Sequence, residues 1–161
     1  MWYIRKIYYS LKNVIKTIKI FRLKHELAKR GVVMTNVIIY GNNLSNLILG
    51  DNIWINDAFL DVQNTITIES NVGFGHQVKI LTGSHDIKKF GKERGKIISK
   101  PVIIKTGAWI ASFAIILPGT EIGEHSVVAA GSVVRGEVPP HTLVAGNPAQ
   151  IVKNLNTQGN L

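Results

Sequence analysis

The sequence predicts an all-β protein: a parallel β-helix of triangular cross-section, preceded by one α-helix and interrupted by one long excursion loop. Aliphatic residues recur every six positions, β-branched runs alternate with Gly, Asn and Asp, and one polar stretch breaks the pattern. Period six fits neither an α-helix nor an amphipathic strand, but it is typical of coils with short flat sides. The recurrence is unbroken at Ile104, Ile110, Ile116, Ile122, Val128 and Val134. If each side takes six residues, three sides close a coil of about 18 residues, and one aliphatic residue of each side lies in a core that the stacked coils share.

The first element is a basic amphipathic helix over residues 1–30. Apolar residues seven positions apart, such as Ile4, Leu11 and Ile18, form a stripe in a segment without Gly or Pro until Gly31. Nine Lys and Arg against the single Glu26 give it 9 − 1 = +8 of the chain's +9 charge. The stripe fits packing within the protein or its oligomer, or binding to an anionic membrane surface. Because no base-stacking or groove-reading motif accompanies the charge, we expect no nucleic-acid partner.

Residues 31–153 are expected to form the β-helix, and residues 154–161 a flexible tail. The six-residue register slips by one position between Asp61 and Thr65, which predicts a bulge or a widened turn. A polar, lysine-rich stretch then predicts an excursion loop over residues 86–103. This loop is typical either of a solvated flap or of a lid over an active site.

Composition narrows the functional classes. The 161 residues suffice for one domain, and 45% hydrophobic and 18% charged residues are ordinary for a globular protein. The absence of cysteine excludes disulfides and thiolate chemistry. No apolar run approaches the roughly 18–20 residues of a membrane span, and the basic N-terminus does not resemble a secretory signal. We therefore expect a cytoplasmic protein, with peripheral contact at the inner face of the membrane as a further option.

Several motifs identify a family. They are Trp109-Ile110, the turn Leu117-Pro118-Gly119, the run from Ala129 to Val134, the pair Pro139-Pro140 and the segment from Ala145 to Ala149. Together with the hexads they resemble the hexapeptide-repeat acyltransferases. Within these, the chain is similar to galactoside and maltose O-acetyltransferases, and most similar to the acetyltransferases of colanic-acid and other exopolysaccharide pathways.

The resemblance implies a left-handed β-helix, a homotrimer and acetyl-CoA held in a groove between adjacent subunits. It implies an acetyl-CoA-dependent O-acetyltransferase whose acceptor is a hydroxyl of a sugar or of a lipid-linked glycan. No metal is expected.

Acetyl transfer to a hydroxyl requires a general base, a donor for the oxyanion and alignment of the two reactants. The chain has five histidines, and His85 stands where the coil pattern is interrupted. The resemblance assigns the general base to this position. Asp86 or Asp61 is expected to orient the imidazole, with Asp57 as a further candidate, and the sequence does not decide among them.

The remaining site residues are expected to bind acetyl-CoA. Trp109 would wall the thioester, and a backbone N–H of Ala111 or Ser112 would donate to the oxyanion. The pantetheine arm would lie along the backbone of Ala129 and Ala130, with Asn147 in a nearby turn. Arg135 and Lys153 would contact the phosphates. Gln150 stands where relatives often carry Arg, which leaves more of that contact to Lys153.

Three alternatives remain open at this point. The acceptor could be serine or a xenobiotic rather than a sugar. The same fold also carries γ-type zinc carbonic anhydrases, which need three histidines at one metal; His76, His85 and His125 are present, but at unusual spacings. A non-catalytic scaffold would have little reason to combine His85, Trp109 and the Asn147-Pro148 turn.

Overall fold

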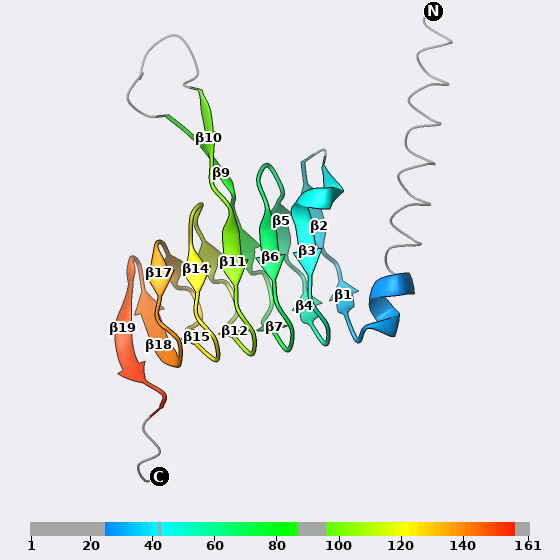
Figure 1. Cartoon of the computed structure of the whole chain (residues 1–161). Coiled ribbons are helices and arrows are strands. Elements are labelled where there is room, and N and C mark those ends of the chain that lie inside the picture. Colours follow the sequence, from blue (N-terminus) through cyan, green and yellow to red (C-terminus); the bar gives the residue numbers. More distant parts are fainter. Residues whose placement is uncertain (1–24, 42, 87–95, 157–161) are drawn as a thin grey trace, which may run out of the picture.

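A computed structural model describes residues 25–41, 43–86 and 96–156 of the chain. Short strands stack into coils with three parallel sheets as the sides of a prism (Figure 1). Sheet A contains β1 (Val33–Thr35), β4 (Trp54–Asn56), β7 (Gly73–Phe74), β12 (Trp109–Ile110), β15 (Val127–Val128), β18 (Thr142–Gly146) and β19 (Ala149–Asn154). Sheet B contains β2 (Ile38–Tyr40), β5 (Phe59–Asp61), β8 (Lys79–Ile80), β13 (Ile115–Ile116) and β16 (Val133–Val134). Sheet C contains β3 (Leu47–Leu49), β6 (Ile66–Ile68), β11 (Val102–Ile104), β14 (Glu121–Ile122) and β17 (Glu137–Val138).

The coil length follows from the strand register. Trp109 lies beside Val127 and Ile115 lies beside Val133, in both cases 18 positions further along the chain. The chain visits sheets A, B and C in turn, so each coil crosses three edges. We call them edge AB, edge BC and edge CA after the sheets that they join. The parallel β-helix predicted from the six-residue period is confirmed.

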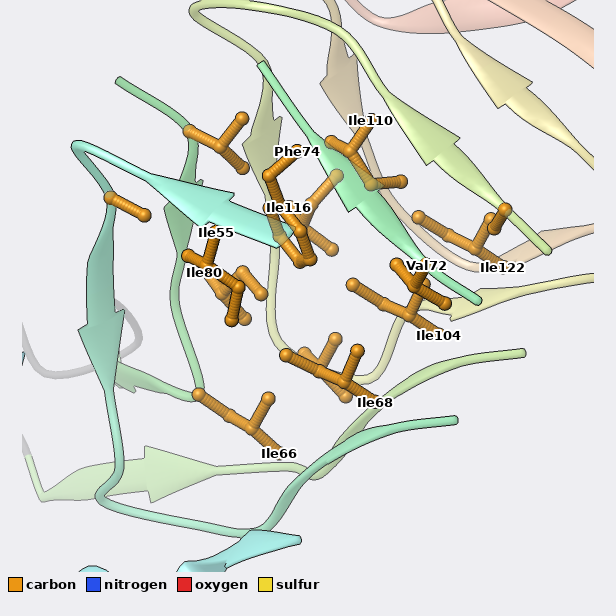
Figure 2. Packing of buried hydrophobic residues seen from close by; sticks show 14 of the residues in the cluster. Ile55, Ile66, Ile68, Val72, Phe74, Ile80, Ile104, Ile110, Ile116 and Ile122 are labelled. Carbon is orange, nitrogen blue, oxygen red and sulfur yellow. The ribbon is translucent and has the colours of Figure 1, made fainter. Parts of the chain in front are cut away.

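Each side of a coil buries two residues rather than the single one expected. The hexad residues Ile104, Ile110 and Ile116 are fully buried, and so are the residues two positions before them. Alternate residues of a strand face the same side, so the pair i − 2 and i both point inward. Figure 2 shows such side chains from several coils gathered in one interior. Toward the C-terminus the earlier member becomes polar, at Thr120, Ser126 and Ser132.

These buried hydroxyl groups are satisfied by backbone partners. The Ser126 hydroxyl donates to the Pro139 carbonyl at 2.7 Å and accepts from Thr142 N at 3.1 Å. Within the part of the chain that the structure describes, no buried side-chain polar atom lacks a hydrogen bond. Burial of these groups therefore avoids the cost of an unsatisfied polar atom.

The corners explain why Asn, Gly and His recur at edge CA. Asn52, Asn71 and His125 all adopt left-handed backbone conformations there, with φ of 55°, 60° and 53°. This region is unfavourable for most side chains but tolerated by Asn and His. The Asn52 amide also donates to the Asn71 side chain of the next coil at 2.8 Å. The corner residues thus bend the chain and connect successive coils.

The register slip lies at edge BC, between β5 and β6. The buried residue Leu60 follows Ile55 after five positions, and Ile68 follows Leu60 after eight. The turn at residues 62–65 holds two extra positions and buries Val62, and the shorter step across edge AB offsets one of them. The predicted slip is therefore present as a widened turn.

The excursion also leaves from edge BC, one coil further on. Strands β9 (Gly83–His85) and β10 (Ile97–Ser99) pair antiparallel and form the base of an arm that projects from the prism (Figure 1). The arm begins earlier and ends earlier than the expected loop 86–103, because Gly83–His85 pair with β10 and Val102 and Ile103 already belong to sheet C. Residues 87–95, which hold most of the lysine-rich stretch, lie outside the described residues.

The two ends of the prism are closed differently. Residues 25–29 are helical, and Leu27 is buried against the first coil. At the other end β19 returns antiparallel along β18, and Leu155 N donates to the His141 carbonyl. The rest of the predicted N-terminal helix, residues 1–24, and residues 157–161 of the predicted tail lie outside the described residues. Among those described, no helix is long and apolar enough to cross a membrane.

Candidate active site

The expected site residues fall into two groups on different edges of the prism. His85, Asp86, Asp61 and Arg135 belong to edge BC. Leu81 N donates to the Ile116 carbonyl, and Leu117 N donates to the Val134 carbonyl. Leu81, Leu117 and Arg135 therefore occupy equivalent positions in successive coils at edge BC, from which the arm leaves. The second group lies on sheet A and around edge AB, and we call it the wall; it comprises Trp109, Ala111, Ser112, Ala129, Ala130, Asn147 and Lys153.

His85 is the last residue of β9 and is exposed on the arm. It pairs in register with Ile97 of β10. The next residue, Asp86, donates its backbone N–H to the Lys96 carbonyl at 3.0 Å. The antiparallel pairing therefore fixes the backbone on both sides of the imidazole.

Asp61 is the buried carboxylate beneath the arm, with only 4% of its surface exposed. Its Oδ2 accepts from Gly83 N at 3.0 Å, and its Oδ1 accepts from Gln63 N at 3.2 Å. The Gln63 side-chain amide donates to the same carboxylate at 3.3 Å. Asp61 thus holds the backbone two residues before His85. Asp57, the further candidate, lies at edge AB, which is not the edge from which the arm leaves.

Trp109 lies on the wall with its indole across a glycine. A Cβ atom on Gly73 would come within 2.6 Å of Trp109 Cε3, so the ring occupies the space that a side chain would fill. Trp109 keeps 45% of its surface exposed, and Trp54 flanks Gly73 from the preceding coil. A shallow pocket of about 200 Å³ lies between the two indoles. The wall therefore presents a flat aromatic surface beside exposed backbone.

The backbone amide groups of the wall differ in availability. Ala111 N donates to the Val128 carbonyl and Ala129 N to the Val144 carbonyl, both at 2.9 Å, so the coil uses these two groups. Among the described residues, no hydrogen bond is found from Ser112 N or from Ala130 N. Of the two amide groups expected to donate to the oxyanion, Ala111 N is therefore engaged within the coil, and Ser112 N is not.

Gly75 lies directly against the Ser112 amide. A Cβ atom at Gly75 would lie 2.5 Å from Ser112 N and from its Oγ. The Ser112 hydroxyl accepts from His76 N at 3.0 Å, which fixes the turn at edge AB. Sequence reasoning missed Gly73 and Gly75 as site residues. Their signal is the presence of glycine at strand positions of the repeat, which indicates a close approach of another group.

The wall continues to the C-terminal end of the prism. Trp109, Val127, Leu143 and Lys153 lie side by side in successive strands. At about 4.8 Å per strand, Lys153 lies roughly 14 Å from Trp109. Next to this row runs a lane of small residues, Gly75, Ala111, Ala129 and Ala145, with Gln150 at its end. Asn147 occupies the turn between β18 and β19.

The histidines do not converge within one chain. His76 lies at edge AB, His85 on the arm at edge BC, and His125 at edge CA, where its ring stacks on His141 with centroids 5.2 Å apart. The described part of the chain contains no cluster of three or more His, Asp or Glu arranged to hold a metal. A hydrogen bond from Lys105 to Glu121, together with the charge of that carboxylate, raises the pKa of Lys105; this pair lies near edge CA, away from both groups.

A β-helix of stacked hexad coils, with an aromatic patch and a lane of small residues on one side, defines a protein of the hexapeptide-repeat class. Residues 101–136 match the family described as bacterial transferase hexapeptide (six repeats). The chain is 32% identical to galactoside O-acetyltransferase from Escherichia coli (strain K12) over 119 residues, which is 73% of this chain and 59% of that protein.

Solved structures extend the similarity over most of the fold. A hexapeptide-repeat containing acetyltransferase from Vibrio cholerae, complexed with acetyl coenzyme A, superposes with a TM-score of 0.72 at 31% identity, over 87% of this chain and 78% of that chain. A maltose O-acetyltransferase from Clostridium difficile 630 gives a TM-score of 0.71 at 32% identity, over 83% and 74%. The chain therefore belongs to the hexapeptide-repeat acetyltransferase family. It spans about half to three-fifths of the length of the curated relatives it matches.

Proposed function

We propose that the chain is an acetyl-CoA-dependent O-acetyltransferase that acts on a sugar hydroxyl in surface or exopolysaccharide synthesis. The observation that carries this proposal is the Ser112 amide beside Gly75, from which no hydrogen bond is found among the described residues, on the same wall as Trp109, in a member of this family. A galactoside acetyltransferase in complex with coenzyme A is among the similar structures, at 29% identity. The sugar acceptor rests on such relatives.

The wall has the features that an acetyl-CoA groove requires. The small-residue lane from Gly75 to Ala145 leaves backbone accessible along the coil axis, and Ala130 N is available for an amide carbonyl of the pantetheine arm. In this proposal Trp109 covers the thioester, and Lys153, at the end of the same row, contacts the phosphates. Acetyl-CoA, as the co-substrate, supplies the acetyl group as a thioester.

His85 acts as the general base in this proposal. Its neutral imidazole accepts the proton of the acceptor hydroxyl while the oxygen forms a bond to the acetyl carbon. The Ser112 N–H donates to the carbonyl oxygen as that oxygen gains negative charge. When the carbon–sulfur bond breaks, the imidazolium returns its proton to the departing thiolate. Asp61 and Asp86 contribute by holding the backbone on either side of His85.

Two chains are needed to complete such a site. His85 and Arg135 belong to edge BC, whereas Trp109, Ser112 and Lys153 belong to the wall. A closed ring of three subunits brings the arm edge of one chain against the wall of the next, because cyclic symmetry places unlike surfaces in contact. This division of the residues supports a homotrimer with one groove at each interface.

Two measurements test the function. Transfer of labelled acetyl from acetyl-CoA to a panel of sugars and lipid-linked glycans is expected to identify an acceptor; activity on free serine alone would contradict the sugar assignment. Mixing the inactive variants His85→Ala and Gly75→Ala one to one, after dissociation and reassembly, is expected to restore roughly a quarter of the wild-type activity, because a mixed trimer regains one intact interface. No recovery would contradict a site shared between chains.

The basic segment over residues 1–30 fits an acceptor carried on a membrane lipid. Its eight excess positive charges would attract anionic headgroups at the cytoplasmic face. Binding to anionic liposomes that survives deletion of this segment would contradict a peripheral membrane contact and favour packing within the trimer.

A further inference from the structure

A cluster of polar side chains joins the widened turn at residues 61–65 to the base of the arm. Thr82, the last residue before β9, is fully buried, and its hydroxyl donates to the Asp61 carbonyl. The same hydroxyl accepts from Asn64 N at 2.9 Å. Thr82 therefore connects to both ends of the turn through a single oxygen atom.

Asn64 extends this connection to the second strand of the arm. Its side-chain Nδ2 donates to the hydroxyl of Ser99 in β10 at 3.2 Å, and its Oδ1 accepts from Thr65 N at 2.7 Å. The Thr82 carbonyl in turn accepts from Lys100 N at 2.9 Å, which closes the base of the arm. Both strands of the arm are thus tied to one turn of the preceding coil.

The contacts at this base are unlike those of the regular coils. Elsewhere successive coils are joined mainly by backbone ladders and by a shared apolar core. The arm strands have little such support, since Ile97 and Ile98 are exposed on β10. The direction in which the arm leaves the prism therefore depends on a few side-chain hydrogen bonds.

We propose that Thr82 and Asn64 are positioning residues, which set the direction of the arm and thereby place His85 against the wall of the neighbouring subunit. This inference rests on the proposed function for its catalytic consequence, since it assumes that His85 is the base. The structural part, that these two side chains orient the arm, does not depend on that assumption. A displacement of about 1 Å at a reacting group can reduce turnover by about a hundredfold.

The kinetic test uses Thr82→Val, which keeps the shape and removes the hydroxyl. We expect kcat to fall about 10- to 100-fold, with little change in KM for acetyl-CoA, because Thr82 lies at edge BC and does not touch the wall that binds it. Thr82→Ser restores the hydroxyl and is expected to restore kcat. Asn64→Asp keeps the acceptor for Thr65 N, loses the donor to Ser99, and is expected to show a smaller decrease.

Ser126→Ala is the matched control. The Ser126 hydroxyl is also fully buried and also donates to one backbone carbonyl and accepts from one amide, but it lies at edge CA. An equal loss of kcat in Ser126→Ala would show that Thr82→Val acts only by destabilising the coil, and would overturn the proposal. In the background of His85→Ala, Thr82→Val is expected to cause no further loss, whereas additive losses would contradict an action through His85.

A measurement without catalysis separates this inference from the proposed function. The chain has no cysteine, so spin labels can be attached at Ile98→Cys on the arm and Glu137→Cys on sheet C. In trimers with few labelled subunits, Thr82→Val is expected to shift or broaden the label-to-label distance, and Thr82→Ser and Ser126→Ala are not. An unchanged distance in Thr82→Val overturns the inference. A changed distance together with a fully active His85→Ala variant would support the positioning of the arm and contradict His85 as the base.

Discussion

The segment from Ile104 to Val134 and the base of the arm, where the turn at residues 62–65 meets β9 and β10, are neighbouring parts of one β-helix, and they are held together differently. In the first, hexad residues fill the interior, and backbone groups pair with the next coil at every strand. In the second, Asp61, Asn64 and Thr82 make side-chain hydrogen bonds to the base of an arm. The first segment is held by contacts that repeat along its whole length. The second fixes the arm by a few side-chain hydrogen bonds that can be replaced one at a time.

The largest expected effect lies on the arm. His85→Ala is expected to reduce kcat about 10²- to 10⁴-fold, the range for loss of a general base. The oligomeric state and the melting temperature are expected to stay unchanged, because His85 is exposed. Turnover with labelled acetyl-CoA measures kcat, calorimetry measures the melting temperature, and the elution volume reports the oligomeric state. Full activity would show that the arm does not carry the base.

The second largest decrease in kcat is expected from a substitution at the wall. Gly75→Ala places a methyl group against the Ser112 amide, and we expect kcat to fall about 10²-fold or more, as for loss of one oxyanion donor. Steady-state kinetics with a melting curve measures this change. Gly131→Ala is the control, because no atom lies within 4 Å of its Cβ position, although its positive φ makes that substitution slightly strained. Wild-type turnover in a folded Gly75→Ala variant would contradict the role of Ser112.

For the free energy of unfolding we expect the opposite order, with a larger loss from a substitution in the hexad segment than from one on the arm. Ile110→Ala removes a fully buried hexad residue and is expected to lower the free energy of unfolding by about 2–5 kcal/mol. Ile98→Ala on the arm is expected to change it by less than about 0.5 kcal/mol, because that side chain is about half exposed. Chemical denaturation at a fixed protein concentration compares them. Equal losses would show that the arm packs on the core of the trimer.

The smallest effect is expected at Lys105 and Glu121. Glu121 raises the pKa of Lys105, so the pair stabilises the folded chain below the ordinary lysine pKa of 10.5, and this stabilisation is lost as the pH rises through the higher folded value. Since the pair is exposed to solvent, Glu121→Gln should change the melting temperature at pH 7 only slightly. At pH values above the folded pKa of Lys105, Glu121→Gln and the wild type should melt alike. A large loss at pH 7 would indicate that this edge is buried between subunits.

Much of the wall could be predicted from the sequence because a repeat of six residues is a local property. Ile104, Ile110 and Ile116 mark the inward positions directly, and Trp109 follows from its place one residue before a hexad position. The second inward position was missed, since Ala108, Thr120 and Ser126 do not look like core residues by type. The pairing of the backbone amides also required the structure: Ala111 N donates to the next coil, whereas no hydrogen bond is found from Ser112 N among the described residues, which makes Ser112 the proposed oxyanion donor.

The sequence by itself determined the coil, the position of its two interruptions and the residue types available for chemistry. These follow from periodicity and composition, which need no knowledge of contacts between distant residues. Only the tertiary structure decided that the slip at Asp61 lies directly beneath the arm of His85, and that His85 and Trp109 stand on different edges of the prism. The physical reason is that the chain returns to the same edge only after it has crossed three sides, and in one coil also the inserted arm. Which residues become neighbours therefore depends on the register between successive coils. Neither the linear spacing of these residues nor their types contains that register.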